Sequence, residues 1–266
     1  MDALTEKQER LLEILRACGS AAVAFSGGVD STLLLRCAHD ALGENCIAVT
    51  ARSAFFPARE AAEAATLCAA MGVQQVTLDM DVLAVPGVAE NPPERCYLCK
   101  RAILAMIRDT AARRGFAEIV EGSNADDALD YRPGGKAIRE LGVRSPLLEA
   151  HLTKAEVRAL SRRLGLPTAD KPAMACLATR FPTGTALTEE GLRRAEAAEQ
   201  YLSSIRLTQK RVRVHGDTAR IEALPEEFAL LTGRAAEVDA KLKALGFRFV
   251  SLDLGGYRTG SMNLKK

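Results

Sequence analysis

The sequence predicts an α/β fold: a parallel sheet with helices on both faces, followed by a smaller α+β domain. Three observations lead to this prediction. Short apolar segments alternate with helical segments between residues 21 and 123, a pattern typical of parallel strands joined by helical crossovers. Polar turns follow the apolar segments, as expected where ligands bind at the carboxyl ends of such strands. From about residue 183 a charged helix and alternating strands take over, so we expect domains over residues 1–182 and 183–266.

The pattern in the first half of the chain predicts four strands and four helices. Leu11 and Ile14 belong to an apolar stripe at helical spacing, and Gly43, Gly72 and Gly115 are residues at which helices are expected to end. The strands are short and apolar, as buried parallel strands are. In order, we expect a helix at 4–17, a strand at 21–25, a helix at 30–42, a strand at 46–50, a helix at 57–71, a strand at 73–80, a helix at 96–114 and a strand at 118–123.

Turn-forming and capping residues predict the elements of the second half of the chain. Residues 130–135 are rich in turn formers and predict a mobile flap. Thr153 and Glu156 match a capping box, which predicts a helix that ends at Gly165. Alternating residues on both sides of Gly216 predict a hairpin. The other expected elements are a short strand at 145–148, a helix at 188–202, a helix at 235–244 and a strand at 247–254.

Composition limits the classes of function. The 266 residues are 48% hydrophobic, enough for a large core, and no apolar run reaches the ~18 residues of a membrane span. The first six residues lack the features of a signal peptide, so we expect a cytoplasmic protein. Seven cysteines in such a protein favour free thiols, metal binding or catalysis over disulfides. A net charge of +2 and 5% aromatic residues do not favour nucleic acid as a partner.

The turn between the first strand and the next helix is the main candidate site. Gly27 and Gly28 let the backbone approach a ligand closely, and the helix start beyond them offers N–H groups to an anion such as phosphate. The turn lacks the spacing and the lysine of the common phosphate loop. Together with Ser26, Asp30 and Ser31, it instead resembles the pyrophosphate loop of PP-loop ATP pyrophosphatases. This resemblance implies cleavage of ATP between its α and β phosphates and transfer of AMP to a second substrate.

Two further loops are expected at the same edge of the sheet. Thr50 and Ser53 follow the second strand and would flank the adenine and ribose of ATP. The turn that begins at Gly122 resembles the Gly-Ser/Thr-Asn-x-x-Asp turn of PP-loop enzymes. A plainer alternative is that Ser123 or Asn124 caps a helix, and both interpretations can hold at once.

The cysteines divide into two groups. Cys96 and Cys99 share one face at the start of a helix and can point at one metal ion or cluster, while Cys176 lies in a proline-flanked loop. A structural zinc site needs a fourth Cys or His ligand. The three histidines have plainer interpretations, His39 on a helix surface, His151 in a loop and His215 in an exposed turn. The remaining cysteines lie in apolar or alanine-rich segments and are expected to be small buried residues: Cys18, Cys37, Cys46 and Cys68.

Taken together and in this order, these motifs resemble the ATP-dependent sulfur-transfer enzymes that build the nickel-pincer nucleotide cofactor of lactate racemase. The shared segments are residues 26–31, 91–100, 121–124, 171–180 and 211–215. The resemblance implies adenylation of the carboxylates of pyridinium-3,5-biscarboxylic acid mononucleotide, release of pyrophosphate and conversion to thiocarboxylates. It also implies that Ser26, Gly27, Gly28 and Ser31 hold the β and γ phosphates, while Asp30 acts there with Mg²⁺.

Two versions of this family differ in the source of sulfur. In one, a cysteine at the position of Cys176 is sacrificed and becomes dehydroalanine. In the other, three cysteines hold a [4Fe-4S] cluster whose open iron binds hydrosulfide. Because Cys96 and Cys99 are present beside Cys176, this chain is similar to the second version, and sulfide or another sulfur donor is an expected partner.

The substrate phosphate has candidate ligands in the predicted hairpin. Arg211 and Arg213 are two residues apart on a strand, so both guanidinium groups leave the same face and can clamp one phosphate. Arg180 lies near Cys176 and can join them. The alternative is a basic face in contact with solvent.

Three other functions stay open on the sequence alone. A PP-loop enzyme that thiolates transfer RNA shares adenylation and can share the cluster, but no RNA-binding domain is recognisable. An amidotransferase or synthetase uses the same loop with ammonia and leaves the three cysteines unexplained. A nucleotide sensor would use the cluster only structurally. We expect the first-named sulfur transferase, acting on a small nucleotide as a homo-oligomer.

Overall fold

The computed structural model describes residues 2–128, 134–172 and 175–258. The chain forms two compact units. Unit 1 consists of Met1–Val85 and Glu94–Met174, and unit 2 consists of Pro86–Pro93 and Ala175–Lys266. The domain division at residue 182 stays a prediction, and the two units are described separately.

Unit 1 contains a parallel sheet with the strand order β3-β2-β1-β4. Its strands are β1 (Ala21–Ala24), β2 (Cys46–Arg52), β3 (Gln75–Asp79) and β4 (Glu118–Val120). Its helices are α1 (Ala3–Arg16), α2 (Val29–Leu42), α3 (Ala58–Met71), α4 (Arg95–Arg113), α5 (Gly134–Glu140), α6 (Pro146–Glu149) and α7 (Lys154–Arg163). Short 3₁₀ turns lie at Gly43–Asn45, Val82–Ala84 and Ala125–Ala128.

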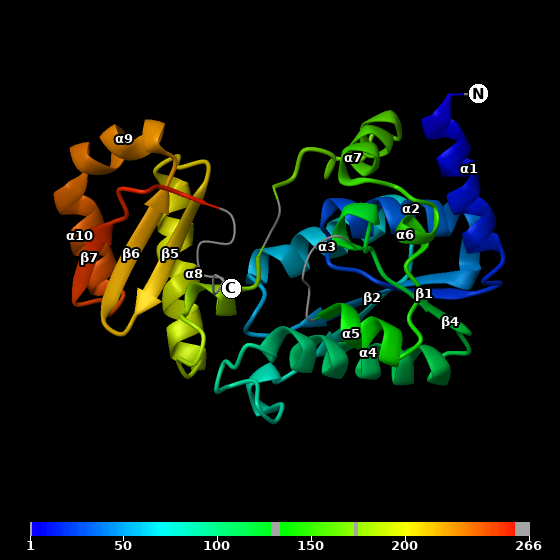
Figure 1. Cartoon of the computed structure of the whole chain (residues 1–266), viewed down its shortest axis with the longest axis horizontal. Coiled ribbons are helices and arrows are strands. Elements are labelled where there is room, and N and C mark those ends of the chain that lie inside the picture. Colours follow the sequence, from blue (N-terminus) through cyan, green and yellow to red (C-terminus); the bar gives the residue numbers. More distant parts are fainter. Residues whose placement is uncertain (1, 129–133, 173–174, 259–266) are drawn as a thin grey trace. The chain divides into compact units, whose positions relative to one another are not determined.

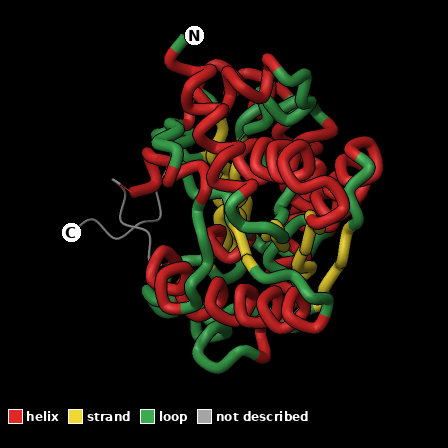
Figure 2. The backbone as a smooth tube through the Cα atoms, turned by 90° about the vertical axis from the view of Figure 1, so that its right-hand side faces the viewer, coloured by secondary structure: helices red, strands yellow, loops and turns green. Residues whose placement is uncertain are grey.

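Two hydrophobic clusters cover the two faces of this sheet. Neighbouring residues of a strand point to opposite faces. Accordingly, Ala21 and Val23 of β1 pack with residues of α1, α2, α3, α6 and α7, whereas Ala22 packs with residues of α4 and α5. Figures 1 and 2 show strands flanked by helices in this way. The predicted α/β class is confirmed.

The predicted strand at 145–148 is wrong. Pro146 begins the short helix α6, because proline lacks an N–H and its fixed φ suits the first turn of a helix. Strand pairing occurs one residue earlier, where Arg144 forms a single parallel bridge with Val120. Residues 130–133 of the predicted flap lie outside the described residues, and Gly134 and Gly135 begin α5.

Unit 2 contains a mixed three-stranded sheet in the order β5-β6-β7. The hairpin of β5 (Lys210–His215) and β6 (Thr218–Ala223) is antiparallel, as predicted, and β7 (Phe249–Leu252) runs parallel to β6. The helices are α8 (Glu189–Ser204), α9 (Phe228–Gly233) and α10 (Ala235–Ala244), with 3₁₀ turns at Leu177–Arg180 and Pro225–Glu227. No helix in the described part of the chain has the length and apolar character needed to cross a membrane.

Candidate active site

The pyrophosphate loop, residues 26–31, joins β1 to α2. Gly27 has φ +71°, in the left-handed region that favours glycine. The hydroxyl groups of Ser26 and Ser31 lie 3.1 Å apart, and Ser31 donates to the carbonyl oxygen of Gly28 at 3.2 Å. Among the described residues no side chain caps the helix start at Gly28. The first N–H groups of α2 therefore have no side-chain cap as acceptor, and such a helix start suits an anion.

The loop after β4 meets the start of α2. A Cβ added at Gly122 would lie 3.1 Å from the backbone nitrogen of Ser31. Asn124 donates through Nδ2 to Oδ1 of Asp30 at 3.1 Å. The same Asn124 accepts the Asp126 N–H at 3.0 Å and so caps the following turn. The predicted meeting of the two loops is confirmed, and Asn124 caps the turn that follows it. A role of this loop in ATP binding stays a prediction.

Two lysines from distant parts of unit 1 contact the pyrophosphate loop. Lys154, the first residue of α7, forms an ion pair with Oδ2 of Asp30. Lys171 donates through Nζ to the carbonyl oxygen of Gly27 at 3.0 Å and pairs with Glu63 at 2.7 Å. The loop motif carries no lysine of its own, so these two residues supply the positive charge beside it.

Thr50 and Ser53 lie at the carboxyl end of β2 as predicted, but both hydroxyl groups have protein partners. Oγ1 of Thr50 accepts from Gln75 at 2.9 Å, and Oγ of Ser53 accepts the Phe55 N–H at 3.2 Å. These contacts hold the end of the strand and the turn after it. Contact of Thr50 and Ser53 with adenine or ribose stays a prediction.

Glu121 is a buried carboxylate between the β4 loop and α4. It accepts hydrogen bonds from Lys100 at 3.0 Å, from the Ser145 hydroxyl at 2.6 Å and from the Ser123 N–H at 2.9 Å. Burial raises the pKa of Glu121, but the charge of Lys100 and these hydrogen bonds outweigh burial and leave the pKa below its ordinary value. Glu121 thus joins the loop at Gly122 to the helix that carries Cys96 and Cys99.

Cys96 and Cys99 lie near the start of α4, where residues three apart share a face. Cys96 is exposed and accepts a hydrogen bond from Nη2 of Arg95 at 3.2 Å, and Cys99 is buried. Across the described residues, no three His, Cys, Asp or Glu side chains gather as a metal site. Cys176 belongs to unit 2.

The other four cysteines are buried, which confirms the prediction: Cys18, Cys37, Cys46 and Cys68. Burial raises the pKa of Cys37 to about 12 and that of Cys68 to about 11. Their thiols are therefore protonated at neutral pH and unsuited to bind metal.

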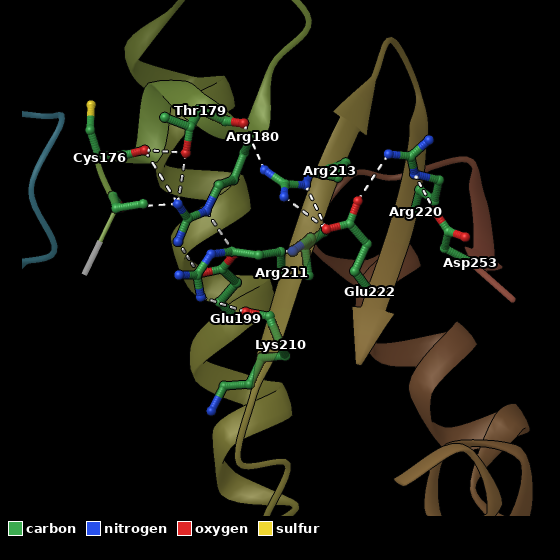
Figure 3. Close-up of polar contacts among 12 residues, drawn as sticks. Cys176, Thr179, Arg180, Glu199, Lys210, Arg211, Arg213, Arg220, Glu222 and Asp253 are labelled. Carbon is green, nitrogen blue, oxygen red and sulfur yellow. Dashed lines mark hydrogen bonds and ion pairs between the residues drawn. The ribbon is translucent and has the colours of Figure 1, made fainter. Parts of the chain in front are cut away.

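Cys176 lies in a short loop of unit 2, residues 175–180, that two buried arginines contact (Figure 3). Arg180 donates to the carbonyl oxygen of Ala175 at 2.9 Å, and Arg213 donates to that of Thr179 at 2.9 Å. Arg180 is 2% exposed and Arg213 4% exposed.

Arg211 differs from these two arginines. It is only partly buried; Nη1 donates to the carbonyl oxygen of Lys210 at 2.7 Å, and its guanidinium lies 5.3 Å from the centre of the Tyr257 ring. Burial and the nearby charge of Arg180 lower the pKa of Arg211. A bound anion would relieve both effects.

Comparison with known proteins identifies the family, although no protein-family model matches the chain. The chain is 41% identical over 268 residues to the pyridinium-3,5-bisthiocarboxylic acid mononucleotide synthase of Lactiplantibacillus plantarum, covering 99% of this chain and 96% of that protein. The chain belongs to this synthase family. An uncharacterized protein of Synechocystis is 39% identical over 262 residues, 98% of each chain. A GMP synthase subunit of Archaeoglobus fulgidus is 27% identical over 177 residues, 62% of this chain and 56% of that protein.

Membership of this synthase family makes the chain an enzyme and confirms the resemblance drawn from its motifs. The sequence did not point to several residues that contact the pyrophosphate loop, the loop after β4 or the arginines at the Cys176 loop. They are Lys154, Glu199 and Glu222, together with Glu121 and Lys171, which were noted only as parts of shared segments. Only Lys154 had a usable signal, because the capping box placed it at the first position of a helix.

Proposed function

We propose that the chain is an ATP-dependent sulfur transferase that converts the carboxylates of pyridinium-3,5-biscarboxylic acid mononucleotide into thiocarboxylates. The observation that carries this proposal is the 41% identity to a synthase named for the bisthiocarboxylic product, over 99% of the chain. The geometry of the pyrophosphate loop supports it, because an uncapped helix start beside two lysines suits a polyphosphate.

The first step is adenylation. A substrate carboxylate oxygen attacks the α-phosphorus of ATP, the bond from that phosphorus to the bridging oxygen breaks, and pyrophosphate leaves. Ser26, Gly27, Gly28 and Ser31 would hold the β and γ phosphates through N–H and hydroxyl groups. Lys154 and Lys171 would stabilise the negative charge that grows on the leaving pyrophosphate. Asp30 already contacts a cation in Lys154, so its carboxylate fits a role in holding Mg²⁺ with the phosphates.

The second step is sulfur transfer. A sulfur nucleophile attacks the carbonyl carbon of the acyl adenylate, the carbon–oxygen bond to AMP breaks, and AMP leaves with both electrons of that bond. If Cys176 is the nucleophile, its sulfur becomes acylated. Loss of the Cα proton then forms the Cα=Cβ bond of dehydroalanine, and the Cβ–S bond breaks as the thiocarboxylate leaves with both electrons of that bond. If hydrosulfide is the nucleophile, the protein is unchanged.

Three cysteines are the candidate ligands of the proposed cluster. Cys96 and Cys99 are one helical turn apart and would supply two thiolate ligands, and Cys176 would supply the third. A [4Fe-4S] cluster held this way would offer one iron without a protein ligand, at which hydrosulfide could bind. We propose the cluster as the sulfur carrier, with the sacrificial reaction of Cys176 as the alternative.

Arg211 is the candidate ligand for the substrate phosphate. We expect Arg211→Ala to raise the substrate KM about 10- to 100-fold, the effect of losing a charged hydrogen bond, and to leave the ATP KM unchanged. Arg248→Ala is the control, because Arg248 is an exposed arginine of the same unit that contacts the Phe249 ring. Equal effects of the two changes would remove Arg211 from the site.

The test of the proposed function uses purified protein, ATP, the mononucleotide and sulfide under anaerobic conditions. We expect AMP, pyrophosphate and a thiocarboxylate product. The product should be about 16 Da heavier than the substrate for each oxygen that sulfur replaces, because a sulfur atom is heavier than an oxygen atom by that amount. Formation of ADP, or binding and thiolation of transfer RNA instead, would contradict it. Mass spectrometry of the protein after turnover separates the two sulfur sources. We further propose that this enzyme works in the cytoplasm, forms a homo-oligomer and receives its sulfur from sulfide or another sulfur donor.

A further inference from the structure

We propose that Arg180 and Arg213 are positioning residues that hold the Cys176 loop, residues 175–180, and that Glu199 and Glu222 hold the two arginines in place. This inference rests on the proposed function, because its readout is sulfur transfer. It gives Arg180 and Arg213 a role different from a clamp on the substrate phosphate.

Arg180 contacts both its own loop and α8. Nε and Nη2 donate to the two carboxylate oxygens of Glu199, each at 2.8 Å. Nη1 donates to the carbonyl oxygens of Ala175 at 2.9 Å and Cys176 at 3.3 Å. Thr179 adds two hydrogen bonds to the carbonyl oxygen of Cys176, from its N–H at 2.9 Å and its hydroxyl at 2.7 Å. The backbone of Cys176 is therefore fixed on its carbonyl side.

Arg213 contacts the other end of the loop from strand β5. Nε and Nη2 donate to Oε2 of Glu222 at 2.9 and 2.8 Å, and Nη1 donates to the carbonyl oxygen of Thr179 at 2.9 Å. Glu222 is fully buried and also pairs with Arg220 at 3.0 Å. Arg220 in turn forms an ion pair with Asp253, with Nε 3.5 Å from Oδ2. Figure 3 shows the resulting line of ion pairs from the Cys176 loop across the sheet.

Burial explains why both arginines are paired. A charge removed from water is destabilising unless an opposite charge and hydrogen bonds compensate it. A guanidinium group can bind a carboxylate with one edge and a carbonyl oxygen with another because its N–H groups lie in one rigid plane. A lysine ammonium keeps the charge but cannot reproduce this planar arrangement.

The thiol points away from this network. Figure 3 shows the Cys176 sulfur directed away from the Arg180 guanidinium, while the carbonyl group points toward it. Cys176 is partly exposed. The two arginines thus fix the direction of the Cys176 side chain through the backbone of its loop.

This arrangement separates the two steps of the reaction. Adenylation depends on the pyrophosphate loop of unit 1, whereas sulfur transfer depends on the direction of Cys176, either as a nucleophile or as a ligand. A loosened loop should therefore leave adenylation intact and slow sulfur transfer, so that the acyl adenylate is lost to water. Misplacement of a reacting group by about 1 Å is enough to lower a rate about 100-fold.

The experiment measures pyrophosphate released and thiocarboxylate formed in the same reaction for Glu199→Gln, Glu222→Gln and Arg213→Lys. We expect the ratio of pyrophosphate to thiocarboxylate to rise at least about 10-fold, with the KM values for ATP and for the mononucleotide unchanged. Glu226→Gln is the matched control, because Glu226 is an exposed glutamate of the same unit, and its ratio should equal that of the wild type.

The two glutamate variants act on different arginines, so one remains informative if the other fails to fold, as judged by circular dichroism. An unchanged ratio in the folded variants would overturn the proposal. A higher mononucleotide KM, with pyrophosphate release and thiolation slowed equally, would overturn it in favour of phosphate binding by Arg213. Absence of mononucleotide-dependent pyrophosphate release from the wild type would instead refute the proposed function.

Discussion

At the pyrophosphate loop, the positive charge beside the helix start comes from residues far away in the sequence. Lys154 is 124 residues from Asp30, and Lys171 is 144 residues from Gly27. The local pattern of serines and glycines predicts the loop because its conformation depends on those residues alone. The contacts of the two lysines with the loop could not be predicted, because only the fold brings these residues to it.

Asp30 provides the residue-scale test of this loop. Asp30→Asn removes the negative charge that pairs with Lys154 and keeps an oxygen for Asn124. We expect pyrophosphate release to slow by about 100- to 1000-fold, the effect of losing one group that stabilises transition-state charge. Asp40→Asn on the same helix is the control, because Asp40 pairs only with the exposed Arg36 side chain among its described contacts. A normal rate for Asp30→Asn would exclude Asp30 from the reaction.

Glu121 gives a residue-scale prediction about pH. Because its pKa in the folded protein is below the ordinary value, the carboxylate contributes stability above the pKa of the unfolded state, about 4.3. This contribution is lost as the pH falls through the lower pKa of the folded state. Glu121→Gln should therefore be destabilised relative to the wild type at pH 7, and the difference should shrink below about pH 4.3.

Urea unfolding followed by circular dichroism measures the free energy of unfolding of Glu121→Gln and of the wild type at each pH. Glu118→Gln serves as the control, because Glu118 lies at the start of the same strand and is less buried. A difference that stays constant down to pH 3 would show that the charge of Glu121 does not stabilise the fold.

Capping residues and apolar periods predict most of the helices and strands that the structure contains. Thr153 accepts the Glu156 N–H at 3.3 Å, and Glu156 accepts the Thr153 N–H at 2.8 Å, which is the predicted capping box of α7. The segment at 145–148 was predicted wrongly because its apolar residues suit a strand, whereas Pro146 favours the first turn of a helix.

The capping box of α7 gives the element-scale prediction. Thr153→Ala removes the cap from the helix that presents Lys154, and we expect the free energy of unfolding to fall by about 1 kcal/mol. Thr66→Ala in α3 is a matched control, since among the described contacts the Thr66 hydroxyl donates to the carbonyl oxygen of Ala62 within its own helix and to no other group. Chemical denaturation of both variants checks this, and equal effects would argue against the cap.

At the scale of the whole molecule, the two compact units are not consecutive in the sequence. Residues 86–93 belong to unit 2, where the N–H of Gly184 donates to the carbonyl oxygen of Asn91 at 2.8 Å and that of Leu187 donates to Ala89 at 2.7 Å. Sequence reasoning placed these residues in the first domain. Their local pattern offers no strand or helix, and their partners lie some 90 residues further along the chain.

Asn91 tests the role of this segment. It is buried, has φ +54° and donates through Nδ2 to the carbonyl oxygen of Pro182 at 2.9 Å. We expect Asn91→Ala to lower the free energy of unfolding by about 2 kcal/mol, from the strained backbone and the lost hydrogen bond. Asn91→Gly relieves the strain and should lose about half as much. Equal losses would assign the whole effect to the hydrogen bond.

In the proposed reaction, a substrate carboxylate becomes joined to AMP before sulfur replaces its oxygen. The most direct measurement uses pyridinium-3,5-biscarboxylic acid mononucleotide with ¹⁸O in its carboxylates, together with ATP, sulfide and the purified protein, and analyses the released AMP by mass spectrometry. Because the attacking oxygen stays on the phosphorus when sulfur displaces AMP, we expect one ¹⁸O atom in each AMP molecule. Release of unlabelled AMP, or of ADP in place of AMP, while thiocarboxylate is formed would contradict it.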